Sequence, residues 1–256
     1  MMPARQRHRV DLVLTLVWRD LVLRYRRSVL GIAWSQLAPL ATLGVLALLF
    51  TRAIPLHIHH YALFVVTGLL AWTWFAGAIV AATESVVQSR DLVRQPGFPV
   101  ALLPVVAIST HLIHLILVIP VLLLIIWLVI GHVALSVTAL PLLIVVQFLI
   151  TLGPAYLLAS MNVRFRDVGH MVGVLLLPLF YATPVFYDSA RIPRNLAGLY
   201  GLNPFAHLVN GYRDALLVGR WPESLPMLAI ALAGGLTTFV GYKVYRFRAI
   251  EFAEQL

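Results

Sequence analysis

Long uncharged stretches alternate with short polar segments along this chain. A helix needs roughly 20 consecutive apolar residues to cross a hydrocarbon core about 30 Å thick, and several stretches are long enough. Because lipid offers the backbone no hydrogen-bond partners, helices are the structure that suits them. The pattern predicts an all-α integral membrane protein with a single transmembrane domain over residues 1–256. Its six transmembrane helices are predicted at about residues 29–51, 61–83, 101–130, 137–160, 169–187 and 225–242.

The third and fourth predicted helices come from one uncharged run. No Asp, Glu, Lys or Arg occurs between Arg94 and Arg164, a distance too long for one span. Gly131, His132 and Ser136 interrupt the run, so we expect the chain to fold back there.

Residues 9–27 show a different pattern, that of an amphipathic helix. Charged residues are too frequent for this segment to cross a bilayer. Apolar residues nevertheless recur at helical spacing on one stripe: Val10, Leu14, Val17, Trp18, Leu21 and Tyr25. This is typical of an interface helix that lies in the membrane surface with its arginines toward water and phosphates. A polar helix packed on a soluble partner would give a similar pattern.

Composition agrees with a chain solvated by lipid, since 61% of its residues are hydrophobic and only 11% are charged. The net charge of +9 comes from basic residues scattered among hydrophobic runs. This distribution favours anionic lipid headgroups over nucleic acid as the partner. Arg19 and Asp20 break the apolar stretch that follows the basic start, so we expect no signal peptide.

The distribution of positive charge predicts an orientation in the membrane. Of the 19 Lys and Arg residues, 14 lie before the first span, after the second, after the fourth or after the sixth. Cytoplasmic loops retain Lys and Arg, so both termini are expected in the cytoplasm. The polar segment 188–222 is then expected on the outer side.

The predicted spans lack the carboxylates that ion-coupled transporters keep near the middle of the membrane, because all ten Asp and Glu residues lie outside them. His111 and His114 are one helical turn apart on the third span. Interhelical hydrogen bonding is favoured for this pair over metal binding, and no metal site is expected.

The chain also lacks the motifs of an enzyme. Its sole lysine, Lys243, is not part of a glycine-rich phosphate-binding loop. Neither Asp-x-Asp nor Gly-x-Ser-x-Gly occurs. We therefore expect no catalytic residues and no cofactor in this chain, with ATP and Mg held by a separate subunit.

Five local patterns follow one another along the sequence. They are Arg24-Tyr25-Arg26-Arg27-Ser28-Val29-Leu30-Gly31 with Trp34 and Pro39; Leu92-Val93-Arg94 with Phe98-Pro99 and Pro104; Asn162-Val163-Arg164-Phe165-Arg166-Asp167-Val168; Thr183-Pro184-Val185; and Asn203-Pro204 with Tyr212-Arg213. This order resembles the permease subunits of ABC-2 type exporters, in the branch that exports O-antigen, capsule and teichoic acid polymers. The resemblance covers essentially the whole chain. One departure is Gln95, Pro96 and Gly97, where the family has a basic, an apolar and an aromatic residue before Phe-Pro.

The resemblance implies a homodimer that works with two copies of an ABC nucleotide-binding subunit. The complex would move a lipid-linked polysaccharide outward across the bacterial inner membrane, as in O-antigen export for lipopolysaccharide biosynthesis. It further implies a cytoplasmic coupling segment at 84–99 and an outer gate segment with re-entrant or gate helices at 188–222.

The resemblance also implies roles for individual residues. The residues expected to contact the ATPase are Arg90, Asp91, Arg94 and Phe98. Those expected at the substrate entrance are Arg24, Tyr25, Arg26, Arg27, Leu30 and Gly31. Those expected to line the channel are Trp34, Phe180, Tyr181, Phe186 and Tyr187, because aromatic faces suit sliding sugars. Those expected at the outer gate are Asn203, Pro204, Tyr212 and Arg213.

Simpler structural roles remain open for these residues, and so do other functions for the chain. Arginines at span ends usually anchor topology, Asn-Pro usually starts a turn or a helix, and aromatic residues usually pack or lie at the interface. An ABC-2 permease for a small drug or lipid is a second function. A membrane factor in lipid-linked sugar assembly is a third, disfavoured by the missing acidic pair.

Overall fold

The computed structural model describes residues 4–26, 41, 44–45, 60–189 and 192–256. The first predicted span, 29–51, lies outside the described residues except for three isolated positions. The structure is helical throughout the part it describes, with no strand there. The helices are α1 (Ala4–Tyr25), α3 (Tyr61–Gln88), α4 (Arg90–Val93), α5 (Leu102–Ile130), the 3-10 turn η2 (Leu135–Ala139), α6 (Leu140–Arg164), α7 (Asp167–Tyr181), α8 (Arg194–Gly201), α9 (Pro204–Arg213), the π-turn η4 (Asp214–Val218), α10 (Ser224–Arg248) and α11 (Phe252–Gln255).

Within the described residues, four helices are long and apolar enough to cross a membrane: α3, α5, α6 together with η2, and α10. They coincide with the second, third, fourth and sixth predicted spans. The α5–α6 connection turns at Gly131, whose φ of 89° is a left-handed conformation that glycine adopts without strain. Helices α3 and α10 run several residues past their predicted ends, to Gln88 and Arg248.

The fifth predicted span corresponds to α7, which is shorter than expected. Its 15 residues extend about 22 Å at 1.5 Å per residue, less than a hydrocarbon core of about 30 Å. The helix ends because Thr183 precedes Pro184, and a residue before proline is disfavoured in helical conformation.

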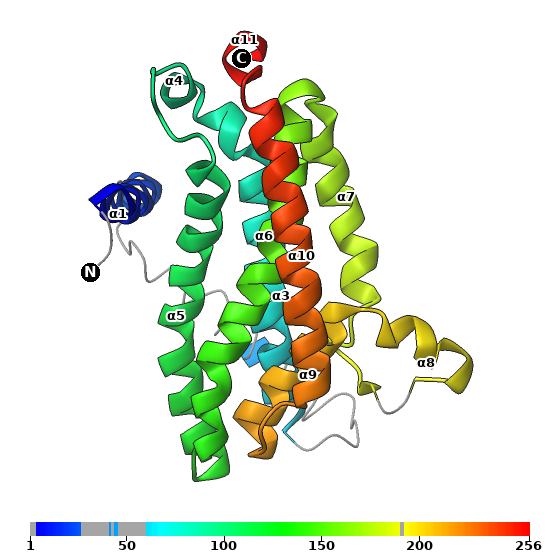
Figure 1. Ribbon diagram of the computed structural model, residues 1–256. Helices are drawn as coiled ribbons and strands as arrows, with labels where there is room; N and C mark the ends of the chain where they lie inside the picture. Colours follow the sequence, from blue (N-terminus) through cyan, green and yellow to red (C-terminus); the bar gives the residue numbers. More distant parts are fainter. Residues whose placement is uncertain (1–3, 27–40, 42–43, 46–59, 190–191) are drawn as a thin grey trace.

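Helix α1 runs across the bundle, as the prediction of an interface helix requires. Figure 1 shows α1 nearly end-on beside α5, whereas the long helices lie along the picture. Leu16, Val17 and Leu21 are buried in a cluster with Val106 of α5. Val10, Leu14 and Trp18 of the predicted stripe face away from the protein, Trp18 with 69% of its surface exposed. The apolar surface of α1 therefore divides into a face packed on α5 and a face available to lipid.

The bundle has two distinct ends (Figure 1). One carries α4, the α6–α7 connection and the C-terminal α11, and we name it the α4 end. The other carries α8, α9 and the start of α3, and we name it the α9 end.

The closest helix contact in the bundle joins α6 to α10, and glycines make it possible. A Cβ atom added at Gly241 would lie 2.5 Å from the carbonyl oxygen of Gly153. One added at Gly234 would lie 2.8 Å from the backbone nitrogen of Ile150. The Thr238 hydroxyl also donates a hydrogen bond to the Leu149 carbonyl, at 2.9 Å. Small residues allow such backbone contact between helices in lipid, where van der Waals packing replaces the hydrophobic effect as the driving force.

The substitution Gly234→Ala tests this contact against its neighbour on the same helix. A methyl group at Gly234 meets the α6 backbone, whereas one at Gly235 meets nothing within 4 Å. We expect Gly234→Ala to destabilise the fold by about 1–3 kcal/mol, as overpacking does. Gly235→Ala should be neutral or slightly stabilising, because alanine favours helix. The melting temperatures of the two variants, purified in detergent, test this difference. Equal melting temperatures would contradict the close contact between α6 and α10.

Candidate functional site

Two of the five sequence patterns meet at the α9 end: Thr183-Pro184-Val185, and Asn203-Pro204 with Tyr212-Arg213. Asn203 caps the N-terminus of α9 by accepting a hydrogen bond from the Phe205 amide, at 3.0 Å. Pro204 occupies the first helical position, where its missing N–H costs nothing. The Asn203 side chain also donates to the Thr183 hydroxyl at 3.1 Å, so the start of α9 is joined to the segment after α7.

Arg213 joins the other end of α9 to the same segment and to α3. Its Nη2 donates to the Val185 carbonyl at 2.7 Å, and its Nε donates to the Phe64 carbonyl at 3.3 Å. The guanidinium carbon lies 3.4 Å from the centre of the Phe64 ring, a cation–π contact. Only 5% of Arg213 is exposed. The residue therefore fastens α9, α3 and the segment after α7 to one another.

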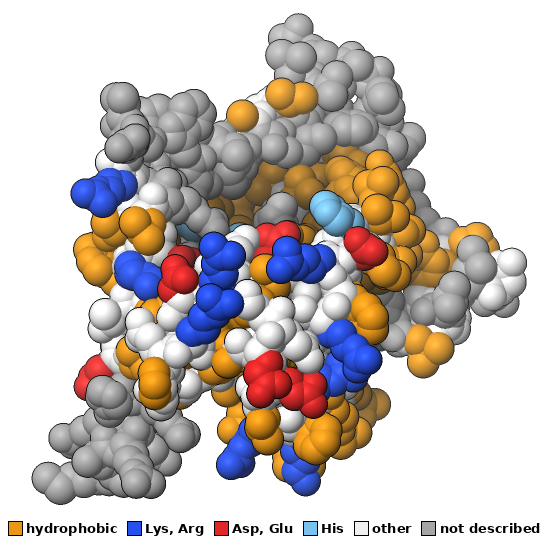
Figure 2. All heavy atoms as spheres, turned by 90° about the horizontal axis from the view of Figure 1, so that it is seen from above, with side chains coloured by type: hydrophobic (Ala, Val, Ile, Leu, Met, Phe, Trp, Pro, Cys, Tyr) orange, Lys and Arg blue, Asp and Glu red, His pale blue; other side chains and the backbone are white. Residues whose placement is uncertain are grey.

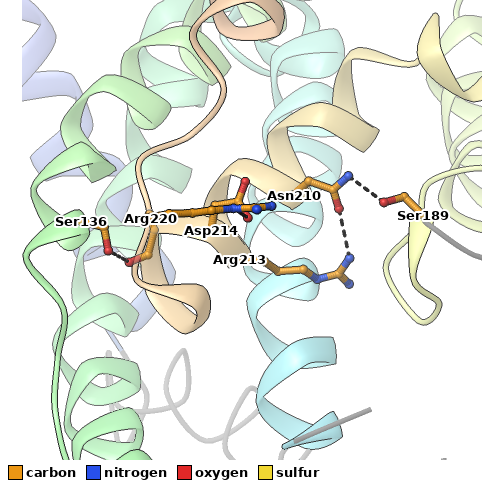
Figure 3. A network of polar contacts seen from close by, with 7 residues as sticks. Ser136, Ser189, Asn210, Arg213, Asp214 and Arg220 are labelled. Atoms are coloured by element: carbon orange, nitrogen blue, oxygen red, sulfur yellow. Dashed lines mark hydrogen bonds and ion pairs between the residues drawn. The ribbon is translucent and has the colours of Figure 1, made fainter. Parts of the chain in front are cut away.

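A polar network extends from Arg213 along the same side of α9. Figure 3 shows Asn210 between Ser189 and Arg213. The Asn210 side chain donates a hydrogen bond to the Ser189 hydroxyl and accepts one from the Arg213 guanidinium. On the next turn, Asp214 accepts a hydrogen bond from Arg220 at 2.8 Å.

This network borders a cavity of about 590 Å³ at the α9 end. Its polar lining residues are His60, Asp188, Ser189, His207, Asn210, Arg213, Asp214, Arg220 and Glu223. The positive and negative groups are mixed, so the cavity does not select a ligand by the sign of its charge.

Burial shifts the proton equilibria of three residues near this end. It lowers the pKa of Arg213 to about 9, opposed by the nearby Asp188 carboxylate and Tyr61. That value is above neutral pH, so Arg213 keeps its charge. Burial raises the pKa of Tyr212, and burial together with the hydrogen bond to Tyr200 raises the pKa of Tyr187. Both phenols are therefore neutral at physiological pH.

The aromatic residues predicted to line a channel have different surroundings in the structure. Phe180 packs inward, with its ring centre 5.3 Å from that of Trp72 and 5.2 Å from that of Phe186. Tyr187 is partly buried, and its hydroxyl is hydrogen-bonded to that of Tyr200 at 2.8 Å. Tyr181, in contrast, has 63% of its surface exposed. Of these four residues, Tyr181 is the one with a free aromatic face in a single copy of the chain.

The residues predicted to contact an ATPase lie at the α4 end, between α3 and α5. Arg90 and Asp91 are on α4 and Arg94 follows it, and all three side chains are exposed. Figure 2 shows basic and acidic side chains interspersed over this end. Exposed charges add little to the stability of a fold, so these are available for contact with another protein.

Phe98 differs from these neighbours because it packs within its own chain. It lies against the α1–α5 cluster that contains Leu16 and Val106, and also against a second cluster that contains Val93 and Phe252. Gly97, in the stretch that departs from the family pattern, has a φ of 81°, which glycine accommodates without strain. The glycine turns the chain so that Phe98 points into the protein.

The predicted entrance residues lie only partly within the described structure. Arg24 and Tyr25 belong to the last turn of α1, and Arg26 follows with an exposed side chain. Arg27, Leu30 and Gly31, like the channel residue Trp34, lie outside the described residues. Within the described part of the chain, no group of three His, Asp or Glu side chains is placed to hold a metal ion.

Comparison with known proteins identifies the family. The sequence pattern of the ABC-2 type transporter family matches residues 11–217, most of the chain. The chain belongs to the ABC-2 type transporter family. The O-antigen export system permease protein RfbA of Myxococcus xanthus is 33% identical over 252 residues, which cover 96% of this chain and 95% of that protein.

Two further relatives have similar coverage. An O-antigen export system permease protein RfbA of Klebsiella pneumoniae is 27% identical and covers 96% of this chain, with 95% of its own length matched. The polysialic acid transport protein KpsM of Escherichia coli is 24% identical, with 91% of this chain and 92% of that protein matched. This ABC-2 type chain is a multi-pass membrane protein that aligns with these permeases along nearly its whole length.

Sequence reasoning missed two residues that hold Arg213 in this ABC-2 type chain. Asn210 is three positions before Arg213, so the spacing of a helix could have paired them. Phe64 is 149 positions away, and no local signal indicates that contact.

Arg213 should be more sensitive to substitution than Arg220. Lysine keeps the charge of Arg213 but lacks the planar fork that reaches two carbonyls, so we expect Arg213→Lys to cost about 2–3 kcal/mol of stability. Arg220→Lys is the matched control, because 65% of the Arg220 side chain is exposed, and it should leave the melting temperature nearly unchanged. Thermal unfolding of the purified variants measures both. Equal losses would show that Arg213 is not the residue that fastens α9.

Proposed function

We propose that this chain is the permease subunit of an ATP-driven ABC exporter that moves a lipid-linked polysaccharide across the bacterial inner membrane. The observation that carries the proposal is the 33% identity to an O-antigen export permease over nearly the full length of both chains. The more distant relative named for polysialic acid transport supports a polysaccharide substrate.

The energy source is a separate ATPase, because this chain has no phosphate-binding loop. Two copies of the permease would work with two copies of the ATPase. Helix α7 offers a surface for the second permease copy: it buries only Val168 and Val172 in its own bundle and exposes an apolar stripe that includes Val174 and Leu177.

The α4 end faces the cytoplasm in this proposal. Arginines from three separate parts of the chain lie there: Arg94 follows α4, Arg166 precedes α7, and Arg246 is in the last turn of α10. Cytoplasmic loops and the helix ends beside them are rich in such residues. Both termini are then cytoplasmic, and the α9 end forms the outer gate, where Asn203, Pro204, Tyr212 and Arg213 fix the position of α9.

Two parts of the substrate path follow from this orientation. Arg24 and Arg26 lie at the end of the interface helix and Arg27 follows them in the sequence, and arginine forks there would suit the phosphates of a lipid carrier. Tyr181, exposed at the end of α7, would present an aromatic face to the sugars.

Deleting the gene in its native host tests the export function. We expect the polysaccharide to disappear from the cell surface and to accumulate inside the cell on its lipid carrier, because synthesis continues without transport. A plasmid copy should restore surface polymer, visible by immunoblot of intact cells and of lysates. Surface polymer that persists in the deletion strain would contradict the proposal and favour a small drug or lipid as substrate. Loss of the polymer from both fractions would instead favour a role in its assembly.

The exposed charges on the α4 segment should control assembly with the ATPase. Reversing Arg90 and Arg94 to Glu replaces two side chains that do not pack in the fold, so the permease should remain stable. We expect roughly a tenfold loss of ATPase recovered with the tagged permease, since opposed charges weaken a complementary interface. Arg166→Glu, an exposed arginine on another connection of the same end, is the control. An equal loss in the control would mean that general charge, not this segment, mediates binding.

A further inference from the structure

Val100 and Ala101, which connect the proposed coupling segment to α5, are held by two tyrosines from helices distant in sequence. The Tyr156 hydroxyl on α6 donates a hydrogen bond to the Ala101 carbonyl, at 3.0 Å. The Tyr245 hydroxyl on α10 donates to the Val100 carbonyl, also at 3.0 Å. In an α-helix the Val100 carbonyl would bond the amide of residue 104, but Pro104 has no amide hydrogen. The Val100 carbonyl accepts a hydrogen bond from the Leu103 amide instead, at 3.0 Å, and Tyr245 is its second donor.

Both tyrosines are set rigidly among other side chains. Tyr245 is fully buried and Tyr156 is 5% exposed, with their ring centres 5.2 Å apart in an edge-to-face contact. Tyr245 makes a second edge contact at 5.2 Å with Phe252, which anchors the C-terminal α11 in the same cluster as Val93 of α4. The hydroxyls therefore have fixed positions from which to hold the segment.

The two helices that carry these tyrosines form one unit. Gly153 is one turn before Tyr156, and Gly241 is one turn before Tyr245, so the closest backbone contact of the bundle lies beside the tyrosine pair.

A cavity of about 680 Å³ lies behind this part of the segment. Pro99 and Leu102 line it on one side, with Tyr242, Arg246 and Ile250 on the other. Packing on this side is incomplete, and the two hydrogen bonds add directed contacts to the apolar packing of Phe98, Val100 and Ala101 on the cluster of the tyrosines.

We infer that Tyr156 and Tyr245 are positioning residues that fasten the coupling segment to the α6–α10 pair. When the ATPase displaces the segment, the displacement passes to α6 and α10 together, and not only to α3 and α5. This inference rests on the proposed function for the identity of the segment. Its structural part, that the segment and α10 move as one body, is independent of the substrate.

The double substitution Tyr156→Phe with Tyr245→Phe removes both hydroxyls and keeps both rings. Assembly with the ATPase and basal ATP hydrolysis should be unchanged in the purified complex. We expect polymer exported per ATP hydrolysed, in vesicles, to fall roughly fivefold, because two hydrogen bonds no longer hold the segment. Tyr242→Phe on the same helix and cavity is the matched control, since that side chain is exposed, and it should export as the wild type does.

A distance measurement tests the coupling without any polymer. The chain contains no cysteine, so Gln95→Cys and Arg246→Cys place spin labels at two exposed sites, one on each side of the proposed connection and neither among the residues assigned to the ATPase contact. In the wild-type background the distance distribution should be narrow and unchanged between the nucleotide-free and ATP-bound complexes. In the double-Phe background it should broaden and shift on ATP binding.

The outcomes separate this inference from the proposed function. Identical distributions in the two backgrounds, or equal export in the double-Phe variant and the wild type, would overturn the inference. Loss of assembly or of basal hydrolysis in the double-Phe variant would also overturn it, because the hydroxyls would then serve folding. Absence of export by the wild-type complex would count against the proposed function. The distance measurement would still show whether the tyrosines hold the segment to α10.

Discussion

The contact between α6 and α10 is the interaction on which the rest of the bundle depends. In lipid, helices gain little from hiding apolar surface, so close packing and hydrogen bonds must hold them together. Gly153, Gly234 and Gly241 bring the two backbones to a separation that no larger side chain permits. The remaining helices are arranged around this pair: α3 is tied to α6 through the hydrogen bond from Gln147 to the Ala71 carbonyl, at 2.7 Å.

The two ends of the bundle use charge in opposite ways. At the α4 end, Arg90, Asp91 and Arg94 are exposed, cost nothing to solvate and remain free to contact a partner. At the α9 end, Arg213 is buried, and a buried charge is tolerated only where hydrogen bonds compensate its desolvation. The carbonyls of Phe64 and Val185 supply that compensation, so Arg213 serves the internal arrangement of this end.

How far the sequence predicted this structure depends on the range of the interactions involved. Hydropathy alone located α5 to within one residue at each end. Every position of a span must suit a lipid environment, so the span is a continuous apolar stretch with its backbone hydrogen bonds inside the helix. Asn203-Pro204 indicated the start of α9, because a helix cap depends only on residues that are adjacent in the sequence. The exposure of Tyr181 and the inward packing of Phe180 were not predictable, because both residues fit the same apolar pattern and only the neighbouring Trp72 distinguishes them. The contact between Arg213 and Phe64 was not predictable either, since it joins residues 149 positions apart.

The fastening of α9 limits how the proposed outer gate can move. Asn203 holds the start of α9 to Thr183, and Arg213 holds its end to Val185 and to α3. A swing of α9 alone would break both connections and take the two compensating carbonyls away from a buried charge, which is far more costly than moving the connected parts together. In the proposed exporter, the gate therefore opens by shifting α9, α3 and the segment after α7 as one body. The passage for the polymer then lies outside this body, along the exposed face of α7 that ends at Tyr181, where a second copy of the chain would complete its wall.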